Sequence, residues 1–559
     1  MPTIEVDYKD FQNLLGIELP KDKEQVDDLL AYVKGEVKQL SEQELSIEIK
    51  DSNRADLWSV EGLARALRGF LGIEKGLKNY SVVNYSDVKV EVSSRLRDIR
   101  PYIGCAVIED VQLTDVILRQ AMRLQDKLDQ TCGRNRRRTS IGLYNFDLIS
   151  PPLSYGVAKP DEAGFVPLDF AEKLTLREIL EKHPKGLEHG HIVKEYAVWP
   201  LLTDSKGNVL SFPPIINSND LGRITKDTKN VLVEVTGTSH ETVLNTLNLV
   251  VVSLADRGGK IYSAEIHYSY GPKKKVVTPQ LQTKTMQIGL ESINEVLGFG
   301  LTRDELLRLL EKARYGVSRG QGQTLTVVVP CYRIDIMHQV DIAEDIAIAY
   351  GYNKIKPRWQ RLPVSGGLTP KAQFSDLIRE LMIGLGYQEV LTFIMTNPEN
   401  LLTKMRLEPK KVVEVANPRM TTMTCIRNWL LPSLLEFLSH NTHVEYPQKI
   451  FEVGYAVVFD EKAETKTRDA VKLACVSTHS SANFAEIKSN LEALLLNIGL
   501  KHFEIHKDRH PSFIEGRTAA VYAKRKNIGV LGEIHPQVLN NWELKNPAAA
   551  FEINLEVLH

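Results

Sequence analysis

The sequence predicts a multidomain protein of the α+β class. The chain has 559 residues, and at about 150 residues per domain this length indicates several separate cores. Hydrophobic residues make up 43% and charged residues 25% of the chain, which is typical of globular proteins and excludes a disordered chain or a coiled-coil rod. Segments with helical spacing of apolar residues are mixed with short strand-like runs, so both element types are expected along the whole chain.

Charge and cysteine content exclude several functional classes. Lysine and arginine total 70 against 71 acidic residues, a net charge of -1, so no global basic field indicates nucleic acid or an anionic membrane, and any RNA contact has to be local. The five cysteines form no C-x-x-C pair, which argues against a disulfide framework or a thiolate metal site. The longest apolar run, Leu247 to Leu254, is too short to span a membrane. We expect a cytoplasmic protein without a signal peptide or membrane contact.

Residues 1–90 and 91–270 are predicted to form the first two domains. The first is a small α+β domain whose segment from Val60 to Gly72 has one apolar helical face. The second contains mixed strands and helices, beginning with a helix that carries apolar residues at helical spacing (Ile117, Ala121, Leu124 and Leu128). In this domain EYAVWPLLT and NVLSFPP flank the turn residues 204–207, which predicts a β-hairpin.

Two further domains are predicted at residues 275–358 and 365–559. The stretch GPKKKVVTP, residues 271–279, has the composition of a linker before the third domain. Thr302 to Glu305 form a capping box that predicts the start of a helix. After a second linker rich in proline and glycine, the fourth domain begins with an apolar-faced helix that ends before Gly386 and a strand-like VLTFIMT.

Several familiar catalytic motifs are absent or misplaced. The sequence has no phosphate loop, no G-x-G-x-x-G and no H-E-x-x-H. Residues 316–320 match G-x-S-x-G, but a nucleophile elbow needs a strand before the serine, whereas a helix is predicted there. His189-Gly190-His191 could form a metal pair on a strand, although no third ligand is evident, and surface loop histidines are the simpler interpretation.

The densest basic run is GRNRRRTS. It is a candidate for phosphate contact with a nucleic acid, or alternatively a solvated face or an interface. The candidate residues are Arg134, Arg136, Arg137 and Arg138.

The most specific cluster in the sequence is acidic. Asp341, Glu344 and Asp345 stand at i, i+3 and i+4 of a predicted helix, which places their carboxylates on one face, and Asp335 lies just upstream. A hard divalent cation with oxygen ligands, usually Mg²⁺ inside cells, would relieve the repulsion between them. A solvated acidic face near the helix N-terminus remains the alternative.

This acidic segment, RIDIMHQVDIAEDIAIAYGY, resembles the metal-binding module of the phenylalanyl-tRNA synthetase beta-subunit family. DSNRADLWSVEGLARALRGFLG is similar to that family's N-terminal domain, and RPYIGCAVI with QDKLDQTCGRNRRRTSIGLYNFD and LLTDSKGNVLSFPPIIN is similar to its editing domain. LGYQEVLTFIMTN, NPRMTTMTCIRNWLLPSLLEFLSHN and KIFEVGYAVV resemble its catalytic-like domain. The length and the order of these pieces are those of the archaeal and eukaryotic form.

The resemblance implies specific sites. It implies magnesium ligands at Asp335, Asp341, Glu344 and Asp345, within a helical module. In the editing domain it implies a pocket that discriminates tyrosine, formed by Leu202, Ser211, Asn217 and Glu234, although several relatives carry aspartate where Glu234 stands. We expect Ser211 to contact the phenol hydroxyl and Leu202 to lie against the ring.

The C-terminal region resembles a class II synthetase core, an antiparallel sheet with helices, that lacks the active-site signatures. Ile450 occupies the position of the ATP-clamping arginine two residues before Glu452, and GVLGEIHPQVLNNWEL lacks the second arginine. The resemblance therefore implies that an alpha subunit binds ATP and phenylalanine. It further implies an assembly of two alpha and two beta chains that acts on tRNA(Phe). Helix 371–385 and the run WLLPSLLEFL are the expected interface elements.

Two functional hypotheses remain. The first is the beta chain of a phenylalanine-tRNA ligase that also hydrolyses mischarged tyrosyl-tRNA(Phe). The second is a non-catalytic assembly and tRNA-binding subunit with an inactive editing domain. Hydrolysis of mischarged tRNA separates the two hypotheses.

Overall fold

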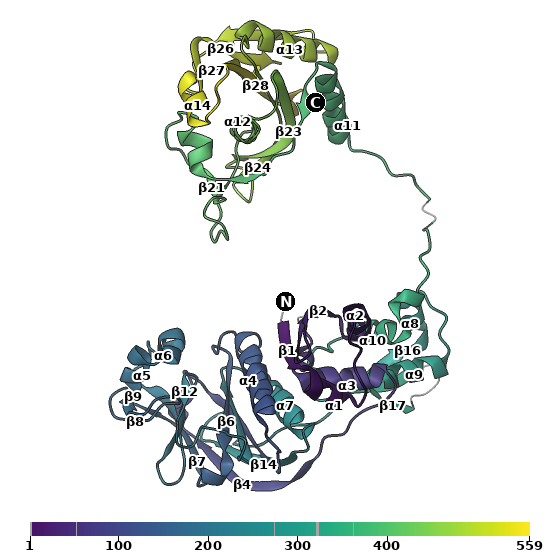
Figure 1. The fold of residues 1–559 in the computed structure, drawn as a ribbon, viewed down its shortest axis with the longest axis vertical. Helices are drawn as coiled ribbons and strands as arrows, with labels where there is room; N and C mark the ends of the chain where they lie inside the picture. The colour runs from purple at the N-terminus through teal and green to yellow at the C-terminus, as the bar shows by residue number, and fades with distance from the viewer. Residues whose placement is uncertain (1–2, 52, 273, 320–323, 361–362, 559) are drawn as a thin grey trace. The chain divides into compact units, whose positions relative to one another are not determined.

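The computed structural model describes residues 3–51, 53–272, 274–319, 324–360 and 363–558, and Figure 1 shows their arrangement. The chain divides into two compact units, Met1–Arg358 and Trp359–His559. Both combine helices with β-sheets, so the predicted α+β multidomain class is confirmed.

The first unit begins with a small α+β domain. Its antiparallel sheet has the order β1-β3-β2, formed by Thr3–Asp7, Glu44–Ile49 and Gly35–Leu40. The helices α1 (Tyr8–Leu15), α2 (Lys23–Leu30) and α3 (Val60–Phe70) accompany this sheet. Helix α3 is buried along almost its whole length because it packs on α1 and also reaches a later helix, α9 (Arg303–Lys312).

A large mixed sheet forms the middle of the unit, in the order β12-β11-β10-β7-β4-β14-β5-β13-β6, with β15 beside β14. Its strands are β4 (Val82–Val92), β5 (Tyr102–Glu109), β6 (Thr139–Asn145), β7 (Leu153–Ala158), β10 (Trp199–Thr203), β11 (Val209–Phe212), β12 (Ile216–Asn217), β13 (Val231–Gly237), β14 (Lys260–Tyr268) and β15 (Lys275–Thr278). Helices α4 (Asp115–Gln130) and α7 (His240–Ala255) pack against it (Figure 1). The short elements β8 (Gly164–Phe165), β9 (Leu174–Thr175), α5 (Leu176–Lys182) and α6 (Pro184–His189) lie at its far end (Figure 1).

The sheet curls so that its two edges meet. The Asn217 side chain on β12 donates to the Leu143 carbonyl on β6 at 3.3 Å, and the Asn145 amide donates to the Leu221 carbonyl at 3.2 Å. The inner side holds a buried apolar cluster that includes Tyr144. The predicted hairpin is confirmed, because β10 and β11 pair antiparallel around a turn in which the Asp204 carboxylate accepts two backbone N–H bonds.

The third part of the unit, predicted as a helical module, contains a small sheet as well as helices. A small antiparallel sheet, β16-β18-β17 (Lys284–Gly289, Thr324–Val329, Gly316–Arg319), accompanies α8 (Leu290–Leu297), α9 (Arg303–Lys312) and α10 (Gln339–Tyr350). The capping box at Thr302 is confirmed. The G-x-S-x-G segment begins β17 rather than an elbow, and its last residue, Gly320, lies outside the described residues.

Two predicted boundaries fall inside the large sheet. Strand β4 starts at Val82, before the predicted boundary at residue 90, and pairs with β14 and β7. Residues 275–278, expected in a linker and at the start of the third domain, form β15 and pair with β14. In both cases backbone pairing with β14, which composition does not reveal, assigns the segment to the large sheet.

The second unit is built on a sheet of order β19-β23-β24-β28-β27-β26-β25, with antiparallel neighbours except for β19 beside β23. These strands are Gln388–Glu389, Gln448–Phe459, Thr467–Thr478, Ala548–Asn554, Lys526–Ile534, Phe513–Ala523 and Phe503–Lys507. Helix α12 (Leu431–His440) packs on one face, whereas α11 (Pro370–Gly384) and α13 (Phe484–Asn497) belong to the core on the other. A short sheet (β20 Met395–Thr396, β22 Cys425–Ile426, β21 Val413–Glu414) and α14 (Pro536–Asn541) complete the unit.

Helix α12 corrects one expectation about the interface. The run WLLPSLLEFL was expected to bind a partner, but Leu431, Leu434 and Leu435 are fully buried in the core of this unit. In α11, by contrast, Leu377 and Ile383 are exposed. Of the two expected interface elements, only α11 presents large apolar side chains to solvent.

Candidate functional site

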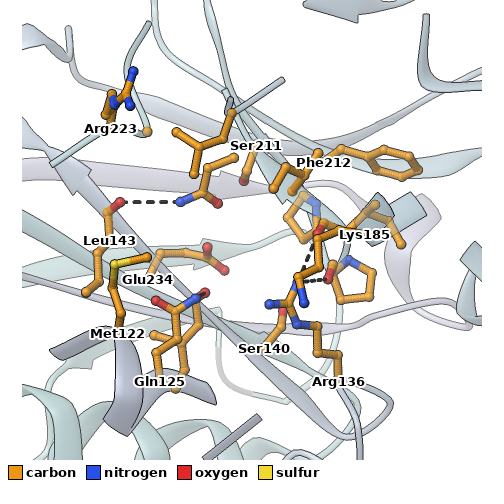
Figure 2. Close-up of a pocket in the computed structure, with 18 of the residues that line it drawn as sticks. Met122, Gln125, Arg136, Ser140, Leu143, Lys185, Ser211, Phe212, Arg223 and Glu234 are labelled. Carbon is orange, nitrogen blue, oxygen red and sulfur yellow. Dashed lines mark hydrogen bonds between the residues drawn. The ribbon is translucent and has the colours of Figure 1, made fainter. Parts of the chain in front are cut away.

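A cavity of about 440 Å³ opens where the edges of the curled sheet meet (Figure 2). Strand β6, the segment from β11 to β12, and helix α4 supply most of its lining. Three of the predicted pocket residues, Ser211, Asn217 and Glu234, are among the lining residues. The fold thus brings together side chains from three separate strands.

Glu234 is the chemically distinctive group of this cavity. Its side chain is almost fully buried on the inner side of the sheet, and the Tyr144 hydroxyl donates to its Oε2 atom at 2.8 Å. The same hydroxyl lies 2.9 Å from Ser211 Oγ. The Oε1 atom of Glu234 has no hydrogen-bond partner in the described part of the chain. A buried carboxylate with one unsatisfied oxygen is costly, so it points to a function.

Burial raises the pKa of Glu234 to about 7, although the Tyr144 hydroxyl and Arg100 both favour the ionised form. Burial, followed by the adjacent Glu234, also raises the pKa of Tyr144 well above its ordinary value. Near neutral pH the carboxyl is therefore present in both protonation states, while the phenol stays protonated. The pair can both accept and donate hydrogen bonds.

Leu202 is the predicted pocket residue that the structure places elsewhere. It pairs with Ser211 across β10 and β11 but is fully buried in the apolar cluster with Tyr144, and it does not line the cavity. Leu202 therefore lies beside Ser211 in the sheet but outside the lining of the cavity. Asn217 keeps its place in the lining, and its amide group donates to the Leu143 carbonyl.

The four predicted tRNA-contact arginines separate into two groups. Arg136 points inward, where its guanidinium pairs with Asp129 at 2.9 Å and donates to the Ile215 carbonyl at 2.9 Å, so it braces the cavity wall (Figure 2). Arg134, Arg137 and Arg138 surround a neighbouring depression of about 690 Å³ together with His191 and Thr238. Backbone φ angles of 50° at Arg134 and 65° at Arg136 fix this loop in the left-handed region.

The histidine pair does not form a metal site on a strand. His189 ends α6 and is buried, contrary to the expected surface loop, whereas His191 lies in the next turn. Burial and the nearby Arg136 lower the pKa of His189 to about 4. His189 is therefore neutral at physiological pH and serves packing.

The four predicted metal ligands in and before α10 have other partners. Asp335 pairs with Arg333 at 2.7 Å, and Asp345 pairs with Arg333 at 2.6 Å and accepts from the Tyr315 hydroxyl at 2.5 Å. Asp341 accepts the backbone N–H groups of residues 337 and 338 at the start of the helix. Glu344 forms a salt bridge with Lys34 of the N-terminal domain.

These contacts do not fit a magnesium ion bound by this chain alone. Burial would raise the pKa of Asp345, but Arg333 and Arg54 outweigh it and hold the pKa below its ordinary value. The arginines therefore already neutralise the carboxylate charge that a metal cation was expected to neutralise. Across the described ranges, no group of three or more histidine, cysteine, aspartate or glutamate side chains is arranged to hold a metal.

The second unit offers a weaker candidate site. Glu452 is buried in an ion pair with Arg427 at 2.7 Å, and Ile450, where an arginine would clamp ATP phosphate, is buried in the core. A depression of about 600 Å³ lies over β23, β24, β27 and β28, but its floor charges, Lys472 and Glu552, pair with each other at 2.8 Å. In neither unit does a described helix have the length and apolarity needed to cross a membrane.

Comparison with known proteins agrees with this arrangement. The family model of the phenylalanyl tRNA synthetase beta chain CLM domain matches residues 355–555, and that of the tRNA synthetase B5 domain matches residues 286–352. The beta subunit of phenylalanine–tRNA ligase from Pyrococcus furiosus is 44% identical over the full length of both chains, and that from Methanocaldococcus jannaschii is 40% identical over the full length. The chain belongs to the phenylalanine–tRNA ligase beta-subunit family.

A solved structure supports the same assignment for the first unit. An N-terminal fragment of the phenylalanyl-tRNA synthetase beta subunit from Pyrococcus horikoshii is 43% identical and has a TM-score of 0.60. The match spans 63% of this chain and the whole of the fragment. Membership of the beta-subunit family therefore extends over the cavity and over the module with the paired carboxylates.

Sequence reasoning missed two residues that adjoin the Glu234 side chain of the cavity lining, Tyr144 and Gly142. Both lie in β6 within the segment SIGLYNF, whose alternation predicts a strand, but nothing in the spacing shows that the Tyr144 hydroxyl meets Glu234. The available signal was the buried position of a tyrosine, because a buried hydroxyl needs a partner.

Proposed function

We propose that this chain is the beta subunit of a phenylalanine-tRNA ligase and hydrolyses tyrosyl-tRNA(Phe) in the cavity between β6 and β12. The observation that carries the proposal is the buried pair of Glu234 and Ser211 in that cavity. Glu234 Oε1 lacks a partner and would accept a hydrogen bond from the hydroxyl group of a tyrosine side chain. The proposal favours an active editing domain over a purely structural subunit.

The need for such a site follows from selectivity. A pocket shaped for phenylalanine rejects the same ring with one added hydroxyl only about a hundredfold. A second site can reverse the preference by offering a polar partner, because a phenylalanine ring would leave that partner buried and unsatisfied. Glu234 provides such a partner with minimal exposure to competing water.

Hydrolysis consumes one water molecule and breaks the ester between the amino acid and the terminal ribose. The water oxygen bonds to the ester carbonyl carbon, the ribose oxygen leaves and takes up a proton, and free tyrosine and tRNA result. The lining residues contain no serine–histidine–aspartate arrangement in the described part of the chain. We therefore assign positioning to the cavity residues, and activation of water to the hydroxyls of the terminal adenosine.

The deciding experiment measures loss of the tyrosyl group from tyrosyl-tRNA(Phe), with phenylalanyl-tRNA(Phe) as the control substrate, for the chain with and without the alpha subunit. Glu234→Ala should lower kcat/KM for the tyrosyl ester about 10- to 100-fold, the range for losing a hydrogen bond to a charged group. Glu241→Ala, an exposed carboxylate at the start of α7, is the matched control. Absence of hydrolysis by the unmodified complex would overturn the proposal and leave the assembly role.

The tRNA backbone is proposed to pass over Arg134, Arg137 and Arg138 beside the cavity. These side chains surround one depression at the surface, and phosphate contacts are the usual role of such a cluster. Arg136 is not included because its guanidinium is engaged by Asp129 and by backbone carbonyls.

Aminoacylation itself is assigned to the complex. We propose that an alpha subunit binds ATP and phenylalanine, that two alpha and two beta chains assemble, and that the second unit is a class II-like core without catalytic groups. The buried Ile450 at the predicted ATP-clamping position supports this division. A cytoplasmic location is supported by the five cysteines, all of which are unpaired thiols.

Magnesium is not assigned to the carboxylates of this chain alone. Asp335 and Asp345 are paired with Arg333, and Asp341 caps its own helix, so the group is already neutralised. We propose that these carboxylates join the N-terminal domain to the following module through Arg54 and Lys34.

A further inference from the structure

Tyr144 stands between the two polar groups of the proposed editing pocket. It is fully buried on β6, and its single hydroxyl lies 2.8 Å from Glu234 Oε2 and 2.9 Å from Ser211 Oγ. The hydroxyl has one proton, so it donates to the carboxylate and accepts from the serine. The three side chains come from β6, β11 and β13 and form one connected chain of hydrogen bonds.

Gly142 makes this arrangement possible. It faces Glu234 directly across β6 and β13. A Cβ atom at position 142 would lie 2.3 Å from the Tyr144 hydroxyl and 2.6 Å from Glu234 Oε2. The absence of a side chain therefore lets the tyrosine ring lie across the strand and reach the carboxylate.

Because of this contact, the two oxygen atoms of the Glu234 carboxylate have different surroundings. Tyr144 occupies Oε2, whereas Oε1 has no hydrogen bond of good geometry among the described residues, and the nearby Thr236 hydroxyl favours the ionised carboxyl. A carboxylate held by one oxygen has a fixed orientation, because its plane cannot rotate without breaking the bond to the tyrosine. The free oxygen is then preorganised for an incoming hydroxyl.

We propose that Tyr144 is a positioning residue for tyrosine selectivity: its hydroxyl fixes Glu234 and Ser211 so that Glu234 Oε1 is reserved for the phenol of the mischarged amino acid. This inference rests on the proposed editing function and deepens it. The ligand that the site recognises is a phenol carried on an aminoacyl ester, and Tyr144 acts on it only through Glu234.

The test compares two tyrosine-to-phenylalanine variants in the complete complex with the alpha subunit. Tyr144→Phe removes the hydroxyl between Glu234 and Ser211. Tyr155→Phe is the matched control, because Tyr155 is equally buried in the same cluster but donates to the Arg100 carbonyl. Initial rates of tyrosyl- and phenylalanyl-tRNA(Phe) hydrolysis are measured for both variants at several substrate concentrations and pH values.

We expect Tyr144→Phe to lower kcat/KM for the tyrosyl ester about tenfold, mainly through a higher KM, the size expected for one lost hydrogen bond. The rate with phenylalanyl-tRNA should not change. The acid limb of the pH profile should move to higher pH, because the lost bond favoured ionised Glu234, while Arg100, Asp129, Cys105, Tyr155 and the Thr236 hydroxyl around the carboxyl are unaltered. Tyr155→Phe should change neither selectivity nor the profile.

A second variant tests the contact between Tyr144 and Glu234 without removing the hydroxyl. Gly142→Ala keeps every hydrogen-bonding group but pushes Tyr144 away from Glu234, so it should reproduce the selectivity loss of Tyr144→Phe. Equal selectivity and pH profiles in Tyr144→Phe and Tyr155→Phe would overturn the inference while leaving editing intact. If the unmodified complex does not hydrolyse tyrosyl-tRNA, the proposed function fails instead, so the two failures are distinguishable.

Discussion

The buried Glu234 carboxyl lowers the stability of the folded protein, and the same carboxyl is the proposed partner of the tyrosine hydroxyl. Its carboxyl is buried with one oxygen unsatisfied, and its pKa is raised to about 7 from an ordinary value of 4.5. The folded protein therefore binds a proton more tightly than the unfolded chain. Stability falls as the pH rises from about 4.5 to about 7, and above that range the full cost of ionisation is present.

Glu234→Gln should remove this pH-dependent cost. At about 1.4 kcal/mol per pKa unit, the variant should be up to about 3 kcal/mol more stable than the unmodified protein at pH 8, with the gain vanishing below about pH 5. The free energy of unfolding of the first unit, followed by hydrogen exchange of β13 amides, measures the effect. An equal gain at both pH values, or the same gain in the exposed control Glu241→Gln, would contradict the explanation.

The sequence identified this residue only through resemblance. Ser211, Asn217 and Glu234 were found because their segments are similar to a known pocket, and the structure brings them together. Leu202 was expected against the ligand ring; it pairs with Ser211 but lies in the buried apolar cluster, and such burial at the curled sheet depends on long-range pairing. Tyr144 and Gly142 act through contacts that cross strands, which a linear pattern does not encode.

Among the elements, α10 differs most from its predicted role. The i, i+3, i+4 carboxylates do lie on one helix, as the spacing indicated. The prediction of a cation did not anticipate that Arg54 and Arg333, distant in sequence, reach the same region. Short capping signals such as Thr302 to Glu305 were predictable because every interaction in them is local.

Arg333→Met should separate the arginine and magnesium explanations of this cluster. Removing one partner of a buried ion pair costs about 3–5 kcal/mol, so the first unit should unfold at lower temperature or denaturant concentration. Added Mg²⁺ should recover part of the loss in the variant, because Asp335 and Asp345 then lack their arginine. The unmodified chain should respond neither to Mg²⁺ nor to EDTA in thermal unfolding, and a clear response would restore the magnesium assignment.

At the scale of the whole molecule, two compact units are joined by a segment whose described residues have no regular structure. The described residues from Lys356 to Pro370 are exposed, and Trp359 is 99% exposed. Composition predicted this linker well, because proline and glycine punctuate it. The domain borders inside the first unit were less predictable, since β4 and β15 join a sheet whose other strands are remote in sequence.

Limited proteolysis should therefore cut between residues 356 and 370 before it cuts either unit. Two resistant fragments are expected, and the fragment ending near Arg358 should keep the thermal unfolding transition of the first unit. Mass spectrometry of early digestion products measures the cleavage position. First cleavage inside the curled sheet or inside the sheet of the second unit would contradict this division.

The contact between α3 and α9 has a consequence for synthesis on the ribosome. Gly69 lies so close to the Lys312 carbonyl that a Cβ atom would approach it to 2.3 Å, so the two helices complete one shared core. At about 5–20 residues per second, the stretch from Phe70 to Arg303 takes roughly 10–50 seconds to translate. During that interval the emerging N-terminal domain exposes the apolar surface that the later module covers. We expect ribosome-associated chaperones to bind this surface until α9 has been translated.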